Sequence, residues 1–384
     1  MRKRASASAD TSKRIRLAAK KVIRRRGIDA GSISEIVRVA GLTTGAVYGR
    51  FESRDDLLLH VWDEDSGAAI FERLGRRLRD WRDATGSALP PAELSDAEEF
   101  GLQMMAVAGR HPYFAETVRD DFSKLLNKYA AVREDGQIRA GEALILALEL
   151  ARICYRAVRA DYEDWSIATQ VFDDVARQIN TVLIPQAQSS SSGNNIAEGR
   201  VSDLVQSCRR VVSQVGLEHA TLSRIARGAG FTTGSIFAQF DTREEFLRTA
   251  IAQLFAGAAT QVDRRIVESQ GRDLLSVALG DLLMVSQNQA RREWNAFRTE
   301  CFLSARTGSF VRSTLRSVIS AGRNRYEELL MPLTGFRHEY LGGVTVVGQA
   351  LPVGLNILNN LNPTVARLVQ TESVNLLLRK IGVD

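Results

Sequence analysis

Hydrophobic residues along the chain recur with helical spacing. In the first such stretch Ile15, Ala18, Ala19, Val22 and Ile23 fall three or four positions apart, so they would form one apolar stripe on a helix. Glycine and proline punctuate the later stretches, and no run shows the two-residue alternation of a half-buried strand. The pattern predicts an all-α chain.

Two shorter helices are predicted after the first, which we expect to end at Gly27. Ser32 and Glu35 have the spacing of a capping box at the start of the second helix, and Gly41 would stop it. The predicted buried face of this helix comprises Ile33, Ile36, Val37 and Ala40.

A third helix is predicted where Thr43 can act as an N-cap. Val47 and Phe51 would pack inward from it. The exposed start of this helix is then lined by the small residues Thr44, Gly45 and Ala46.

The chain contains an internal repeat. Residues 27–58 align without a gap onto residues 216–247 at a constant shift of about 189 positions (230 minus 41), with about a dozen identities. The first helix has upstream counterparts at the same shift, namely Leu204, Cys208, Val211 and Val212. The repeat predicts two copies of one structural unit.

A polar, serine-rich run over 185–195 separates the copies and has the composition of a flexible connector. We therefore predict a first head at 1–60, the helix-turn-helix domain, followed by a first helical body at 61–184. A linker at 185–199 would lead to a second head at 200–249 and a second helical body at 250–384. The last two helices predicted in each body carry apolar stripes that include Leu144, Leu148, Ala151, Tyr155, Val171, Phe172, Val175, Ile179, Val182, Val344, Val347, Leu351, Leu355, Val365, Leu368 and Val369, and Pro363 stands at a helix start.

Positive charge is concentrated at the start of the chain. The formal net charge is +6, yet residues 2–54 contain roughly 14 lysines and arginines against about 4 acidic residues, an excess larger than that of the whole protein. The first helix contributes Lys20, Lys21, Arg24, Arg25 and Arg26 outside its apolar stripe. This distribution favours nucleic acid as the partner, with an anionic membrane surface as the rival.

Other classes of protein find little support. Cys154, Cys208 and Cys301 are far apart and the four histidines form no pair, so we expect no disulfide framework, no metal site and no cofactor. No nucleophile elbow or phosphate-binding loop is present, which predicts a protein that is not an enzyme, although scattered catalytic residues stay an alternative. The apolar windows are short or interrupted and no export signal is complete, so we predict a cytoplasmic protein without membrane spans.

Two short helices around a glycine-containing turn, the second presenting its N-terminal end, follow the helix-turn-helix plan for entering a DNA major groove. Small side chains there allow close approach to base edges, and free backbone N–H groups favour phosphate oxygens. Arg50 and Arg54 can add phosphate contacts. The alternative is that these helices serve only as packing units.

These residues resemble the DNA-binding signature of TetR-family regulators. In the first copy the signature is matched by Ala40, Gly41, Thr43, Gly45, Val47, Tyr48, Phe51, Ser53, Arg54 and Asp55. In the second copy it is matched by Ala229, Gly230, Thr232, Gly234, Ile236, Phe237, Phe240, Thr242, Arg243 and Glu244. The resemblance covers the two heads and implies two TetR-like units in tandem, each with a divergent helical effector and dimerisation domain.

The resemblance also implies what the head residues contact. Those facing bases would be Thr44, Ala46, Thr233 and Ser235. Those holding phosphates would be Thr43, Tyr48, Arg50 and Arg54, matched by Thr232, Phe237, Gln239 and Arg243. The predicted DNA surfaces are completed by Ser34, Gly45 and Gly234.

The second head departs from the family pattern. Phe237 lacks the hydroxyl that the family uses on the DNA backbone, and Arg50 and Gln239 stand where the family usually has a histidine or another polar aromatic residue. We therefore expect weaker binding by the second head and an asymmetric operator. The rival prediction is a second half that serves only in dimerisation or protein docking.

Family members pair through their last two helices and respond to small, mostly apolar molecules bound in the body. The resemblance thus implies either intramolecular pairing of the two halves in a single-chain pseudo-dimer or a homodimer of whole chains, and a repressor released by a small apolar effector. Candidate effector-binding residues are Phe100, Met104, Met105, Phe122, Met284, Trp294, Phe297 and Phe302, although ordinary core packing would also explain them.

Overall fold

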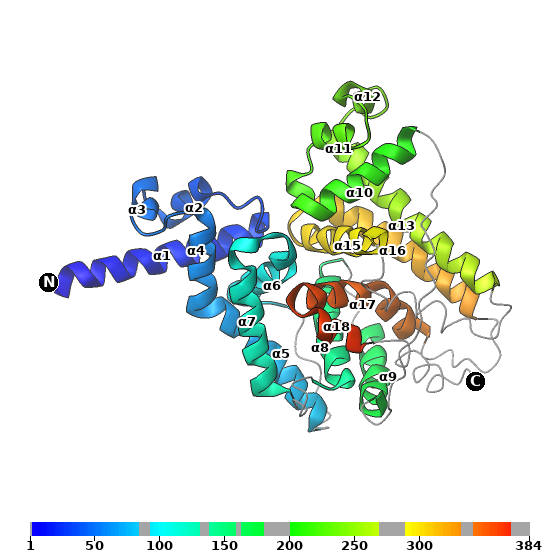
Figure 1. Ribbon diagram of the computed structural model, residues 1–384, viewed down its shortest axis with the longest axis horizontal. Coiled ribbons are helices and arrows are strands. Elements are labelled where there is room, and N and C mark those ends of the chain that lie inside the picture. The colour runs from blue at the N-terminus through cyan, green and yellow to red at the C-terminus, as the bar shows by residue number, and fades with distance from the viewer. Residues whose placement is uncertain are drawn as a thin grey trace.

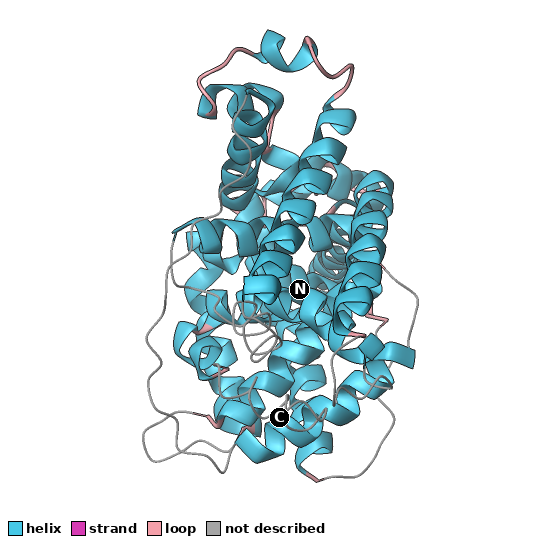
Figure 2. Ribbon diagram, turned by 90° about the vertical axis from the view of Figure 1, so that its right-hand side faces the viewer, coloured by secondary structure: helices cyan, strands magenta, loops and turns pink. Residues whose placement is uncertain are grey.

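The structure is a computed structural model that describes residues 2–83, 93–130, 138–158, 163–179, 200–268, 289–331 and 341–369. Figure 2 shows this part of the chain as helices joined by loops, with no strand. The all-α prediction is confirmed for these residues. The predicted linker 185–199 and the candidate Met284 lie outside them.

The helices of the first half comprise α1 (Arg2–Arg26), α2 (Ile33–Ala40), α3 (Thr44–Tyr48), α4 (Arg54–Val61), the π-helical turn η1 (Trp62–Ser66), α5 (Gly67–Arg82), α6 (Asp96–Val107), the 3-10 turn η2 (Ala108–Arg110), α7 (Pro112–Tyr129), α8 (Ala140–Arg156) and α9 (Glu163–Ile179). Those of the second half comprise α10 (Arg200–His219), α11 (Leu222–Gly228), α12 (Thr233–Phe237), α13 (Arg243–Glu268), α15 (Gln289–Thr307), α16 (Ser309–Leu330), α17 (Leu341–Leu361) and α18 (Pro363–Leu368).

The first three helices form as the apolar pattern predicts. The stripe of α1 is buried at Ile15, Ala18, Ala19, Val22 and Ile23, and α2 buries all four residues expected on its inner face. Glycines with positive φ follow both helices, at Gly27 (82°) and Gly41 (61°), because a left-handed residue ends a helix with little strain only when it lacks a Cβ.

Two local expectations need correction. Lys20 was expected on the basic surface of α1, but it is buried and its ammonium lies 2.5 Å from Asp65, in the π-helical turn that follows α4. The capping box of α2 forms only in half: the hydroxyl of Ser32 accepts from the backbone N–H of Glu35, whereas the Glu35 carboxylate pairs with Arg26 and Arg38. In both cases the side chain pairs with an opposite charge, 45 residues away for Lys20 and three and nine residues away for Glu35.

Helices of the two halves share one bundle. In Figure 1 α8 and α9 lie beside α17 and α18, and α17 packs against both α8 and α9 while α18 packs against α8. Gly354 of α17 sits directly against the backbone of α8 at Ala147 and Ala151, where a Cβ would collide. The predicted helix start at Pro363 is present, at the first turn of α18. The shared bundle makes the two halves parts of one described core.

Each head continues into its body through helix. In the first half α4 runs into η1 and α5, and in the second half α13 extends unbroken from Arg243 to Glu268, across the predicted boundary at 249/250. Such stiff connections link the orientation of a head to the body beneath it. Within the described residues, no helix is both long enough and apolar enough to span a bilayer.

Candidate nucleic-acid interface

The predicted helix-turn-helix is present in both heads. Gly41 and Gly230 adopt positive φ, at 61° and 76°, directly after α2 and near the end of α11. Val47 and Ile236 are fully buried and anchor the short helices α3 and α12 to the heads. Because the anchor residue faces inward, the opposite side and the N-terminal end of each short helix remain at the surface.

The start of α3 is exposed at Thr43, Thr44 and Gly45, and Ala46 is half-buried. Thr43 occupies the N-cap position, but its side chain makes no capping hydrogen bond, and the same holds for Thr232 in the second head. The hydroxyl of Thr232 lies instead 3.3 Å from that of Ser235. The capping position was therefore predicted correctly, whereas the capping bond is absent.

Tyr48 and Phe237 occupy the same place on the two heads. Their side chains are 56% and 54% exposed, values that are high for large aromatic residues. The repeat thus places an exposed aromatic ring at the same position of both heads, where it can contact a partner. The two heads differ at this position in the hydroxyl group, which Tyr48 carries and Phe237 lacks.

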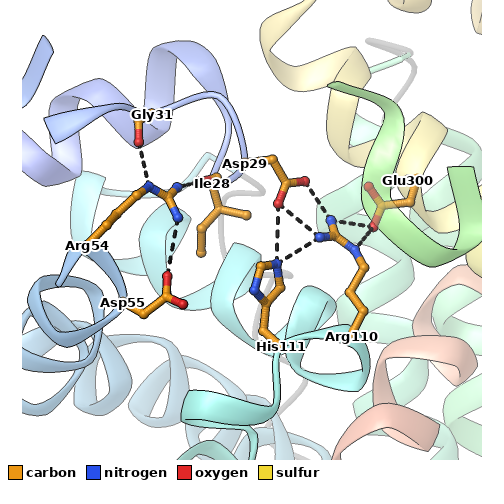
Figure 3. Close-up of polar contacts among 8 residues, drawn as sticks. All are labelled: Ile28, Asp29, Gly31, Arg54, Asp55, Arg110, His111 and Glu300. Atoms are coloured by element: carbon orange, nitrogen blue, oxygen red, sulfur yellow. Dashed lines mark hydrogen bonds and ion pairs between the residues drawn. The ribbon is translucent and has the colours of Figure 1, made fainter. Parts of the chain in front are cut away.

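Arg54 and Arg243 are placed differently from the prediction. The Arg54 guanidinium turns inward and donates to the carbonyl oxygens of Ile28 and of Gly31, the latter at 2.8 Å. Arg243 donates in the same way to the carbonyl of Leu217, at 2.7 Å, and lies 3.5 Å from that of Ala220. Figure 3 shows the Arg54 contacts.

Burial lowers the pKa of the Arg54 guanidinium from its ordinary value. The two arginines therefore hold the loop after the first helix of each head. This contact is made twice, at positions related by the repeat. A phosphate contact from either arginine stays a prediction that the observed contacts do not favour.

Arg50 and Gln239, which were expected to contact the DNA backbone, each fold back onto their own short helix. Arg50 donates to the carbonyl of Ala46 at 2.9 Å, and Gln239 donates to that of Ser235 at 3.1 Å. Both side chains are exposed and release only one hydrogen bond each to reach an external phosphate. The two heads thus share one local architecture with different chemistry on its surface.

A family model described as "Bacterial regulatory proteins, tetR family" matches the chain at residues 15–61 and again at 204–250. The chain carries two TetR-family DNA-binding domains in tandem. No curated protein matches the chain in a sequence comparison. The predicted resemblance, the duplication and the class of DNA-binding regulator are confirmed.

One pair of candidate contacts was missed by the sequence argument. Arg38 and Arg227 are identical across the repeat and exposed on α2 and α11, the first helices of the two TetR helix-turn-helix pairs. Ser34, which was predicted, is exposed on the same helix as Arg38. Identity between the copies at an exposed position was the available signal, because packing does not require an arginine there.

The predicted effector-binding residues lie in the core of the bodies. Met104, Met105, Phe122 and Phe297 are fully buried, and Trp294 is 5% exposed. Their rings and sulfurs pack on other side chains, as in the contacts of Phe122 with Phe71 and of Trp294 with Phe255. None of them lines a described cavity.

A charged cluster joins the first TetR head to both bodies (Figure 3). Arg110, at the end of η2, makes a two-pronged pair with Asp29, in the loop after α1, at 2.6 and 2.9 Å. The same guanidinium lies 2.9 Å from Glu300 of α15, and His111 lies 3.4 Å from Asp29. The α10 backbone reaches the cluster too, since a Cβ on Gly216 would lie 2.5 Å from the Asp29 carboxylate.

The two carboxyl groups of the cluster shift in opposite directions. Burial opposes ionisation of Asp29, but hydrogen bonds from His111 and Arg110 outweigh it and hold the pKa of this carboxyl well below its usual range. Burial raises the pKa of Glu300, and Arg110 only partly offsets that effect. Both carboxylates in turn raise the pKa of the Arg110 guanidinium, Glu300 through its charge and Asp29 through its hydrogen bond and charge.

Proposed function

We propose that the protein is a sequence-specific transcriptional regulator in which one chain supplies both reading heads of a TetR-type dimer. The observation that carries the proposal is the duplicated head with an exposed α3 or α12 start, set on a bundle that α8, α9, α17 and α18 build together. Two heads on one stiff support suit half-sites about one helical turn apart. By the family resemblance, we propose that this binding represses transcription.

The two heads carry different surfaces, which supports an asymmetric operator. Ala46 of the first head corresponds to Ser235 of the second in the repeat, and Tyr48 corresponds to Phe237. Base-facing roles for Thr44, Ala46, Thr233 and Ser235 and backbone roles for Thr43, Tyr48, Arg50, Thr232 and Gln239 are part of the proposal. We add Arg38 and Arg227 as backbone contacts because both are exposed cations beside the reading helices.

The test is an unbiased selection from random duplexes with the purified full chain, followed by measurement of the mass of the complex. The expected result is a salt-sensitive site with two unlike half-sites and one chain bound per site. A perfect inverted repeat with equal half-site affinities and two chains bound would contradict the single-chain arrangement. An absence of any sequence preference would contradict the function itself.

A second candidate is a protein whose second half serves only in pairing or docking. It is favoured by Phe237, which removes the aromatic hydroxyl from the second head. Replacing Thr233 and Ser235 with alanine separates the two: a loss of about 1–3 kcal/mol in operator affinity supports two reading heads. Unchanged affinity and specificity would support the second candidate.

We infer action in the cytoplasm and a regulatory rather than enzymatic role, in line with the TetR match. Release by a small apolar effector rests on the family resemblance alone. The residues predicted to contact that effector are packed against core side chains.

A further inference from the structure

A polar cavity lies where the two halves meet, next to the charged cluster of Asp29, Arg110 and Glu300. Its volume is about 160 Å³, and Ala106, Gly109 and Arg110 of the first half form one wall. The second half contributes the other walls from α10, α15 and α17, including Glu300 and three asparagines, Asn356, Asn359 and Asn360. The cavity therefore belongs to the junction and to neither body alone.

The lining exposes hydrogen-bonding atoms that have no partner among the described residues. The amide nitrogens of Asn356 and Asn360 are used, on Thr299 and on the carbonyl of Ala106, whereas the side-chain oxygens of both accept no bond from a described group. Arg110 engages only one carboxylate oxygen of Glu300. The Asn359 amide makes no hydrogen bond with any described residue.

These unpartnered atoms are mainly acceptors, with the Asn359 nitrogen as a donor, and the guanidinium groups of Arg110 and Arg292 line the same cavity. A hydroxyl group both donates and accepts, so several hydroxyls on one small molecule match every member of the set. An ammonium ligand offers donors only and would leave the Asn359 nitrogen without a partner. A cavity of about 160 Å³ has room for several water molecules, which suits a polyol of about three to five carbons.

The corresponding place on the other side of the junction is filled. Arg306 stands two residues before Gly308, the residue that precedes α16, just as Gly109 stands two residues before His111, the residue that precedes α7. The Arg306 side chain crosses into the first half, lies 2.8 and 2.9 Å from the Glu99 carboxylate and donates to the carbonyl of Ile153. Gly109 has no side chain to cross, and a Cβ there would lie 2.6 Å from the Asn360 oxygen.

We propose that this junction cavity binds one small polyhydroxylated molecule per chain, held by Asn356, Asn359, Asn360 and Glu300. The site differs from the predicted apolar effector site in place and in chemistry. Because Arg110 and Glu300 belong both to the cavity wall and to the cluster that holds Asp29 of the first head, a bound ligand also changes how firmly that head is held. This regulatory part rests on the proposed function, while the binding itself does not.

The binding test is titration calorimetry on the full chain without DNA, with erythritol, xylitol and D-ribose as probes and putrescine as the amine probe. The expected result is one site per chain for at least one polyol and none for putrescine. Asn359→Leu removes the amide, and Ala296→Leu places bulk in the same cavity. Each is expected to weaken polyol binding about tenfold or more, Asn359→Leu because it leaves a ligand hydroxyl without its contact and Ala296→Leu because its side chain fills the space of the ligand.

The matched control is Asn127→Leu, the same chemical change at an exposed position of α7, which is expected to leave polyol binding unchanged. Thermal unfolding verifies that all three variants fold. Failure of every polyol to bind, equal binding by all variants, or binding of putrescine in place of polyols would overturn the proposal.

The regulatory part is tested by repeating the operator titration at a saturating concentration of the bound polyol. A shift of fivefold or more in affinity, lost in Asn359→Leu, is expected. Polyol binding with unchanged operator affinity would overturn the regulatory part. Operator binding without polyol binding would overturn this inference and leave the proposed function standing.

Discussion

Asp29 and Arg110 form a two-pronged ion pair, with the guanidinium nitrogens 2.6 and 2.9 Å from the two carboxylate oxygens. Both side chains are nearly buried, at 8% and 11% exposure. The pair links the loop after α1 of the first TetR head to the body beneath it. Glu300, which belongs to the second half, shares the same guanidinium.

Replacing Arg110 with methionine should strongly destabilise the fold. The variant leaves the Asp29 and Glu300 carboxylates buried without their cation, a situation that typically costs about 3–5 kcal/mol. Denaturant unfolding measures the loss. Lys124→Met is the control, because Lys124 pairs with Asp121 at the surface and its replacement should change the unfolding free energy little. Equal effects of the two changes would contradict the expected cost of leaving the Asp29 and Glu300 carboxylates buried without Arg110.

Asp29→Asn should reduce stability in a pH-dependent way. At neutral pH we expect a loss of about 1.5–3 kcal/mol, the range for a hydrogen bond to a charged group. Since the pKa of Asp29 is lowered on folding, its contribution is present above the unfolded value of about 3.9 and disappears as the pH falls below it. The difference in unfolding free energy between the wild type and Asp29→Asn should therefore stay constant from pH 7 to about pH 4 and then shrink. A difference that grows on acidification would contradict this assignment.

Arg54→Met and Arg243→Met test the inward placement of these arginines. Each variant loses charge-assisted hydrogen bonds to backbone carbonyls, so its head should unfold more readily, by about 1.5–3 kcal/mol. The slope of operator affinity against salt concentration should stay at the wild-type value. If the slope falls by about one ion instead while stability is unchanged, the arginine holds a phosphate as first predicted.

Exchanging the aromatic residues of the two heads should change the DNA affinities of the heads in opposite directions. Tyr48→Phe removes a hydroxyl from an exposed position and should weaken binding about three- to tenfold on all duplex sequences, with no change in base preference. Phe237→Tyr should strengthen the second half-site by a similar factor. Affinities for operators with each half-site scrambled in turn measure both effects. A base-specific change in Tyr48→Phe would contradict the backbone role.

The heads could be predicted in detail because their information is local. Helix spacing identified the buried stripe of α1 and the inner face of α2, and the end of each helix is marked by a glycine that the chain requires there. The repeat then transferred each conclusion from the first head to the second. The partners of Lys20 and Arg54 could not be predicted in this way. These partners lie in a turn and a loop that come close to the two side chains only when the chain folds.

The amino-acid sequence by itself determined the helical elements, the duplication and the family of the two heads, since periodicity and motif spacing act over a few residues. Tertiary structure alone decided which charged residues turn inward and what fills the junction. Glu99 and Arg306 meet across 207 positions, and Arg110 and Glu300 meet across 190. Such pairs form because buried charges must find partners wherever the packed helices place them, and no local pattern records that choice.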